Sequence, residues 1–303
     1  METRISQFLM NIPIISLLYK KILYQKHLFY FSKDPKILAN RSYKRVFNRN
    51  INWKKPSDLI EKIIWMQFNA DTTLWTQLAD KYAAREYVKI LGYEHLLSQL
   101  YGKYSSPNGI DFNNLPDRFV IKSNNACGTV MLVDDKYKLN LNKTKKVIKQ
   151  WLNYRYGVMN AQLHYLKIPP CIIIEEYLGR NNTNGDSLID YKFTCFDGIP
   201  ESILVVSSRN QKGHPYKLNL YDVKWNPITY NLCQHINDKT VPRPESLDML
   251  ISVCKTLGKN IPYVRIDFYE VDGKPYFGEF TFTTGFGYFT DEYYKYLGSK
   301  LII

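Results

Sequence analysis

Two carboxylates near the end of the chain have the spacing of a metal site on a β-hairpin. Residues 264–282 read VRIDFYEVDGKPYFGEFTF, two strand-like segments around a turn at Asp272-Gly273. Because side chains alternate between the two faces of a strand, the length of the turn decides which residues share a face. A three-residue turn places four polar side chains together: Arg265, Asp267, Glu279 and Thr281. A two-residue turn would point the carboxylates apart. We expect the three-residue turn, which gives Mg²⁺ the oxygen ligands it prefers; a solvated hairpin face is the alternative.

A lysine followed by a short polar loop indicates a phosphate site. Lys122 is near the end of an apolar strand-like segment, and Gly128 closes the loop six residues later. A lysine at the end of a strand can reach a phosphate as a point charge, and loop amides can add donors. Gly128 is followed by Thr129, so the loop is no Walker A motif and a P-loop fold is disfavoured. On its own, Lys122 would be interpreted as a surface lysine.

Three further segments offer polar groups at strand ends. The segment CIIIEEYL ends in Glu175 and Glu176, where a strand edge could meet a purine while a glutamate holds a ribose hydroxyl. Lys192 shares a strand face with Asp190, and an ion pair between them is the alternative to a substrate contact. Arg209 follows the next strand and suits a phosphate or carboxylate.

The hydrophobic periodicity predicts a helical first part and a strand-rich second part. Apolar residues recur at helical spacing up to about Leu91, and strands begin after Pro116. The predicted strands are 118–123, 129–133, 171–177, 190–196, 201–206, 263–270 and 275–282, with helices at 144–154 and 245–257. This order predicts an α+β fold.

Composition and charge limit the class of protein. The 303 residues are 45% apolar and 15% aromatic, enough for a sizeable core. Five cysteines without a CxxC pair indicate reduced thiols in a cytoplasmic protein, and none is a convincing nucleophile. The net charge of +13 would attract nucleic acid, an anionic membrane or a polyanionic substrate.

Much of the positive charge lies in the first 55 residues, after an apolar stretch from Phe8 to Leu18 that is too short to span a bilayer. We expect this segment to pack on the rest of the protein. Peripheral contact with the inner face of the membrane is the alternative.

Taken in order along the chain, these segments resemble the ATP-grasp superfamily, and within it the TupA-like branch. The residues that carry the resemblance are 80–82 with 85–88 (DKYAAREYV), 115–122 (LPDRFVIK), 190–193 (DYKF), 265–269 (RIDFY) and 278–282 (GEFTF). They cover the chain from about residue 50 to its last residues.

The resemblance implies an ATP-grasp fold in which two α+β lobes clasp ATP. It divides the chain into a helical basic N-terminal segment (1–75), a central lobe (76–174) and a C-terminal lobe (175–303). The residues expected to bind ATP are Lys81, Lys122, Asn124 and Gly128 around the phosphates and Glu175, Glu176, Tyr177 and Leu178 around adenine and ribose. The expected catalytic cations are Lys192, Arg209 and Arg265, and the expected ligands of Mg²⁺ are Asp267 and Glu279. Thr281 stands where many relatives have asparagine, so the number of metal ions stays open.

The resemblance also implies a reaction, in which ATP activates a carboxylate as an acyl phosphate that an amine captures. The TupA-like branch is associated with teichuronopeptide and other cell-surface polysaccharides. The expected substrates are therefore a hexuronic acid of a capsule or O-antigen precursor, carried on a lipid, and an amino acid or small amine. A glycosyltransferase or sugar kinase of the same pathway is the alternative. A nucleic-acid-binding protein is disfavoured because the 25 tyrosines are spread along the whole chain.

Overall fold

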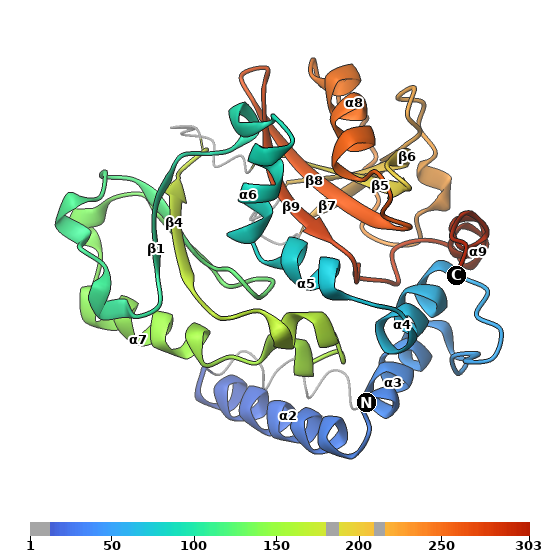
Figure 1. Ribbon diagram of the computed structural model, residues 1–303, viewed down its shortest axis with the longest axis horizontal. Helices are drawn as coiled ribbons and strands as arrows, with labels where there is room; N and C mark the ends of the chain where they lie inside the picture. The colour runs from blue at the N-terminus through green and yellow to red at the C-terminus, as the bar shows by residue number, and fades with distance from the viewer. Residues whose placement is uncertain (1–12, 180–187, 209–215) are drawn as a thin grey trace.

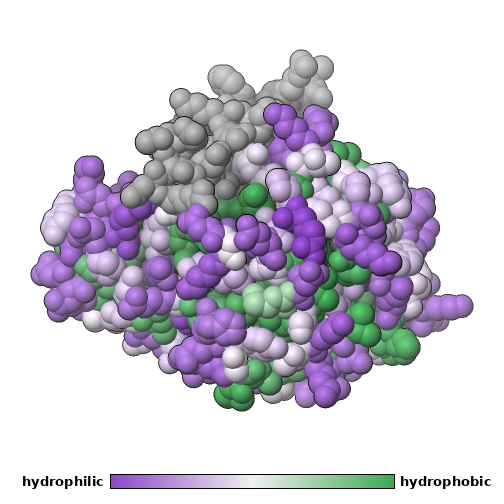
Figure 2. Space-filling view, turned by 90° about the horizontal axis from the view of Figure 1, so that it is seen from above, coloured by the Kyte–Doolittle hydropathy of each residue, from purple (hydrophilic) through white to green (hydrophobic). Residues whose placement is uncertain are grey.

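The computed structural model describes residues 13–179, 188–208 and 216–303, with side chains from Ile22 onward. Two antiparallel sheets lie on either side of helices α5 (Thr73–Ala79) and α6 (Ala83–Ile90) (Figure 1). Seen from above, polar side chains cover most of the surface and apolar ones appear as separate patches between them (Figure 2). No helix among the described residues is both long and apolar enough to cross a membrane.

The first sheet has one apolar and one partly charged face. Its strands, in spatial order, are β1 (Leu100–Tyr104), β4 (Ile172–Glu176), β2 (Phe119–Ser123) and β3 (Val130–Val133). Phe119, Ile121 and Ile174 pack in a core that includes Ile148 of α7 (Leu141–Leu152). Since side chains alternate along a strand, Lys122 and Glu175 are on the opposite face. The strand pattern therefore aims these two charges away from the core.

The second sheet repeats this division. Its strands, in spatial order, are β7 (Lys217–Tyr221), β6 (Ile199–Ser207), β5 (Asp190–Phe196), β8 (Val264–Val271) and β9 (Lys274–Thr281). Phe193 and Ile266 on its apolar face join the same core as Leu250 of α8 (Leu247–Leu257). The other face carries Lys192 and Asp267, which are directly paired across β5 and β8.

The last hairpin puts its two carboxylates on one face, but by a different route from the one expected. Val271 pairs with Lys274, so the turn has two residues, Asp272 and Gly273, both with positive φ (54° and 74°). The register then shifts between Asp267 and Phe268, where a β-bulge at Gly278 brings Asp267 opposite Glu279. The expectation of a three-residue turn was wrong. The shared face that it was meant to explain is confirmed.

The N-terminal helices are anchored to the body of the protein. They are α2 (Pro13–Lys33), α3 (Pro35–Phe47) and α4 (Leu59–Asn69), and the C-terminal helix α9 (Asp291–Lys300) packs against α4. Asp58 caps α4, accepts a hydrogen bond from the Tyr43 hydroxyl of α3 and pairs with Arg49 at 3.0 Å. Arg49 also reaches Asp291 at 2.7 Å. For α3, the expectation that this segment packs on the protein is confirmed. The first part of the apolar stretch, residues 8–12, lies outside the described residues.

Strands β1 and β7 and helix α9 were not predicted. The seven strands that were predicted begin and end within two residues of the observed ones. The proposed division at 174/175 falls within β4, which belongs entirely to the first sheet. The residue numbers of the lobes stay a prediction.

Gly298 tests how closely α9 packs against the start of α4. A Cβ at this position would overlap the Ser57 carbonyl oxygen and lie 2.7 Å from the Asp58 carbonyl carbon. Gly298→Ala should therefore destabilise the protein by about 1–3 kcal/mol through overpacking. In a helix without such a contact, replacing glycine with alanine stabilises the folded state by about 1 kcal/mol.

The measurement is the urea dependence of unfolding, with Ser299→Ala, an exposed neighbour on the same helix, as the control that should change little. A more stable Gly298→Ala variant would contradict the close packing of α9 on α4.

Candidate active site

A buried carboxylate with two cations forms the centre of the site. Asp267 is 1% exposed. Arg265 donates to it from Nε and Nη2, each at 2.7 Å, and the Lys192 ammonium donates to its Oδ2. Lys192 also lies 3.7 Å from Asp190. The alternation of β5 and β8 brings all four side chains to the face away from the core.

Glu279 extends this cluster toward the first sheet. Its Oε1 lies 3.7 Å from Arg265, and its Oε2 lies 3.3 Å from the Lys81 ammonium. The Lys81 ammonium also donates to the carbonyl oxygen of Ala126 at 3.0 Å. Ala126 belongs to the loop between β2 and β3 of the first sheet. One lysine between α5 and α6 therefore joins the polar loop of one sheet to the acidic hairpin of the other.

The loop over residues 124–129 is fixed by the side chain of its first residue. The Asn124 side chain donates to Asp80 at 2.9 Å and to the Pro169 carbonyl at 3.0 Å, and it accepts from the Cys171 amide at 2.8 Å. Its amide group is thus used within the protein, and it positions the loop. Gly128 has φ +75° and nothing within 4 Å of an added Cβ, so the loop is open at this residue.

Lys122 is held by a second buried carboxylate. Its ammonium lies 2.6 Å from Oε2 of Glu175, a residue that is 5% exposed. The other oxygen of Glu175 accepts from Arg85 at 2.7 Å, and Arg85 also donates to the Ser98 carbonyl. No role was predicted for Arg85, although it follows Lys81 by four residues in the motif DKYAAREYV. Arg85 fixes α6, and with it Lys81, to the first sheet.

The expected adenine contacts lie where β4 ends. The backbone amide of Glu176 donates to the Gln99 carbonyl at 2.8 Å, and the Glu176 carboxylate accepts from the backbone amide of Gln99 at 3.1 Å. The backbone amide of Glu176 is therefore used within the protein. Tyr177 stacks under the Arg118 guanidinium at 4.4 Å. Leu178 is half-buried. Of the two glutamates left open for the ribose, Glu175 shares a strand face with Lys122, and Glu176 is on the other face.

Burial and neighbouring charges act in opposite directions on the carboxyl groups. Burial would raise the pKa of Asp267, but Arg265 and Lys192 overcome it and hold the pKa below its usual value. At Glu279, burial is likewise outweighed, mainly by Lys81, and the pKa is lowered. Both groups are therefore anionic at neutral pH, as ligands of a cation must be.

Two tyrosines border the cluster and were missed from the sequence. Burial raises the pKa of the Tyr156 hydroxyl, and the nearby Cys127 thiol and Glu279 carboxylate raise it further. Tyr156 packs edge to face on Tyr165 with ring centroids 5.0 Å apart. Their signal was hidden because tyrosines occur throughout this chain, and these two are in short 3₁₀ segments without periodicity.

The structure thus brings five predicted residues into one cluster: Lys81, Lys192, Arg265, Asp267 and Glu279. Lys122 lies in the neighbouring pair with Glu175. Arg209 lies outside the described residues.

The two carboxylates on the hairpin face suit magnesium whose coordination is completed by a bound molecule. Within the described ranges, no three His, Cys, Asp or Glu side chains form a metal cage. Mg²⁺ in nucleotide sites is commonly held by one or two carboxylates and completed by phosphate oxygens and water. Asp267 and Glu279 supply two carboxylates on one face, with cations beside them for phosphate oxygens. The pair could therefore hold Mg²⁺ only together with a ligand of this kind.

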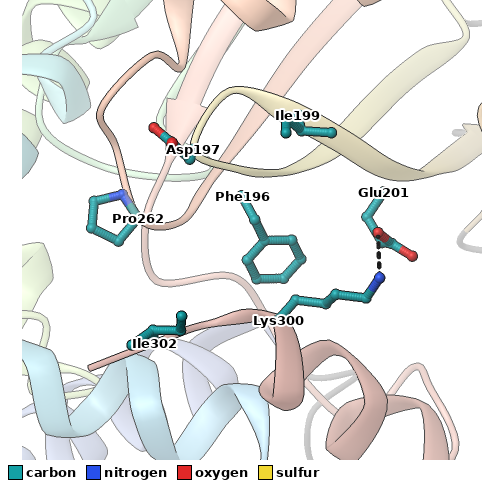
Figure 3. A pocket seen from close by; sticks show the side chains of 7 residues that line it. All are labelled: Phe196, Asp197, Ile199, Glu201, Pro262, Lys300 and Ile302. Carbon is teal, nitrogen blue, oxygen red and sulfur yellow. Dashed lines mark ion pairs between the residues drawn. The ribbon is translucent and has the colours of Figure 1, made fainter.

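A surface hollow lies elsewhere, at the turn between β5 and β6. It has a volume of about 370 Å³, and Phe196, Pro262 and Ile302 are among its lining residues (Figure 3). Its polar lining includes Glu201 paired with Lys300 at 3.3 Å. None of the residues predicted to bind nucleotide or metal lines it. The candidate site is therefore identified by converging charges.

Glu175→Gln tests the buried pair beneath Lys122. Burial would raise the pKa of Glu175, but Lys122 and Arg85 lower it below the usual 4.5. Its stabilising contribution is then complete above about pH 4.5 and is lost as the pH falls through the folded-state pKa. At neutral pH the substitution should cost about 3 kcal/mol, and the difference from the native protein should narrow below about pH 4.5.

Urea unfolding over this pH range makes the measurement. Glu176→Gln, on the same strand, should cost under about 1 kcal/mol at every pH because an amide oxygen can also accept from Gln99. A cost for Glu175→Gln that stays constant on acidification would show that its charge is not what stabilises the fold.

Comparison with known protein families identifies the family of this chain. A model of the TupA-like ATP-grasp family matches residues 61–302. Comparison with curated proteins found no match. Among solved structures, the chain is similar to D-alanine–D-alanine ligase from Bacillus anthracis complexed with ATP, at 16% identity and TM-score 0.46 over 74% of this chain and 65% of that one.

Two further ligases show weaker likeness. D-alanine–D-alanine ligase from Helicobacter pylori has 14% identity and TM-score 0.41, covering 75% of this chain and 61% of that one. The L-amino acid ligase from Bacillus licheniformis has 13% identity and TM-score 0.40, covering 73% and 44%. The chain thus spans less than two thirds of the length of each of these ligases. Because the family model covers most of the chain, and the two sheets and the order of the charged residues follow the expected pattern, the protein belongs to the TupA-like ATP-grasp family.

Proposed function

We propose that this protein is an ATP-dependent carboxylate–amine ligase that forms an amide on a hexuronic acid. The proposal depends on one observation above all. The Lys81 ammonium joins the loop of the first sheet to Glu279 of the second, beside a buried carboxylate that already holds two cations. Three cations and two acids from distant parts of the chain suit a triphosphate with its metal.

The proposed reaction has two steps on the substrates. A carboxylate oxygen of the uronic acid attacks the γ-phosphorus of ATP, the bond to ADP breaks, and an acyl phosphate forms. The amine nitrogen then attacks the carbonyl carbon, phosphate leaves, and the nitrogen loses a proton. Magnesium held by Asp267 and Glu279 would neutralise charge on the phosphate oxygens.

The residues of the chain have distinct tasks in this scheme. Lys81 and Lys122 hold phosphate oxygens as point charges. Lys192 and Arg265 stabilise the charge that develops on the transferred phosphoryl group, because they are already oriented by Asp267. Arg209 is proposed to join them at the substrate carboxylate. Closure of the loop over residues 124–129 would exclude water, which otherwise hydrolyses an acyl phosphate.

The pathway and the location are part of the same proposal. The uronic acid would belong to a cell-surface polysaccharide precursor carried on a lipid, and the amine would be an amino acid or another small amine. The basic chain suits an anionic saccharide. We therefore propose that the enzyme works in the cytoplasm, in peripheral contact with the inner face of the membrane.

The direct test is ADP release from ATP and magnesium against a panel of uronic acid glycosides and amines, with mass spectrometry of the product. We expect sustained ADP release only when acid and amine are both present, because the acyl phosphate must be captured before the next turnover, together with a product of the mass of an amide. The matched neutral hexosides should give none, because they have no carboxylate to activate. A phosphorylated sugar would instead identify a kinase, and turnover of a sugar nucleotide without ATP would identify a glycosyltransferase.

Two variants control this assay. Asp267→Asn removes the charge that orients Lys192 and Arg265 and should lower ADP release by roughly 100-fold or more. Lys295→Ala removes an exposed lysine that pairs only with Asp291 among the described ion pairs, and it should leave the rate unchanged. Full activity of Asp267→Asn would contradict the assignment of the site.

A further inference from the structure

The outer face of α2 combines exposed apolar and basic side chains. Ile22 is 59% exposed and Phe29 is 54% exposed. Lys26 and Lys33 are also exposed, and the four residues recur at helical spacing along one face. The Lys33 ammonium lies 4.5 Å from the centre of the Phe29 ring. We call this face, consisting of Ile22, Lys26, Phe29 and Lys33, the α2 stripe.

The opposite face of α2 attaches the helix to the protein. The Tyr24 and Tyr154 rings lie 5.7 Å apart, and His27 Nδ1 lies 2.6 Å from the Met159 carbonyl oxygen. Because the inner face is used for these contacts, the α2 stripe points outward. In Figure 1 the helix runs along one edge of the molecule, away from the second sheet.

The charge around the stripe is almost entirely positive. Residues 22–47 contain six lysines and arginines and a single acid, Asp34. The carboxylate of Asp34 caps α3 by accepting from the Lys36 amide at 2.8 Å. Arg41 of α3 is exposed and stacks on Tyr30 of α2 at 4.3 Å. The cations near the stripe are thus not neutralised by carboxylates of their own helices.

We propose that the α2 stripe binds the surface of an anionic lipid bilayer. Lysine stems can lie along apolar surface while their ammonium groups reach anionic headgroups, and Ile22 and Phe29 would enter the boundary between headgroups and acyl chains. A nucleic acid would complement the positive charge but would leave exposed isoleucine and phenylalanine without an apolar partner. The interleaving of apolar and basic side chains therefore favours the bilayer.

The test is sedimentation of the full chain with vesicles of phosphatidylcholine alone or with about one third phosphatidylglycerol. We expect binding to the anionic vesicles to be at least about tenfold tighter than to neutral ones, and to weaken with added salt. Ile22→Ser with Phe29→Ser should weaken binding to the anionic vesicles about tenfold or more. Lys26→Gln with Lys33→Gln should do the same by removing charge.

The matched control removes two exposed lysines elsewhere, Lys138→Gln with Lys295→Gln, and should bind as the native protein does. Circular dichroism checks that every variant is folded. Equal binding to both vesicles, native-like binding by the stripe variants, or binding to duplex DNA without binding to vesicles would overturn the proposal. This inference rests on the membrane contact proposed above and assigns it to a surface. The assay needs neither ATP nor a saccharide, so its failure would remove the membrane contact and leave the ligase reaction untouched, whereas failure of the ADP assay would leave the α2 stripe untouched.

Discussion

A carboxylate taken out of water must be surrounded by cations or donors, and Asp267 imposes this requirement on the whole site. Arg265 and Lys192 meet it with direct hydrogen bonds. Once these two cations are fixed, they face Glu279 and Asp190 on the same surface of the sheet. The ionic cluster is therefore a consequence of one buried acid, and it leaves the cations oriented before any substrate arrives.

Helix α6 connects the charged cluster of the second sheet with the first sheet. Arg85 pairs with Glu175 of β4, and the Tyr87 hydroxyl donates to the Leu257 carbonyl at 3.1 Å, at the end of α8. The helix is thus tied to elements on both sides, and Lys81 stands just before it. Lys81 then contacts the polar loop of one sheet and the hairpin of the other. The same connection would couple closure of the loop to binding of a ligand at the hairpin.

Much of the strand order and of the charged face could be predicted from residue patterns, because strand alternation and charge are local signals. The strands around Lys122, Lys192 and Asp267 were located within two residues. The prediction for the turn of the last hairpin was wrong because two arrangements place the same residues on the same face. These are a three-residue turn and a two-residue turn followed by a bulge at Gly278. Strand β7 was missed because it follows a polar stretch, and β1 because LYGKY lacks a clear alternation.

Long-range partners could not be read from the sequence. Arg85 and Glu175 are 90 residues apart, and only folding shows that one anchors the other. Asn124 is predicted to lie at the nucleotide because of its place in the loop, and no sequence pattern indicated that its amide also holds the loop to Asp80 and Pro169. The family resemblance supplied the role of Lys81. For Lys122, the polar loop after the strand indicated a phosphate site, but only the resemblance favoured this role over that of a surface lysine.

If Lys81 and Glu279 act on one bound triphosphate, their contributions to binding cannot be independent. Calorimetric titration of ATP with magnesium into the native protein, Lys81→Met, Glu279→Gln and the double variant measures this coupling. We predict that each single substitution weakens binding and that the double variant differs from the sum of the two by about 1 kcal/mol or more. Effects that add to within about 0.5 kcal/mol, or no effect of either substitution, would contradict a single nucleotide site between the two sheets.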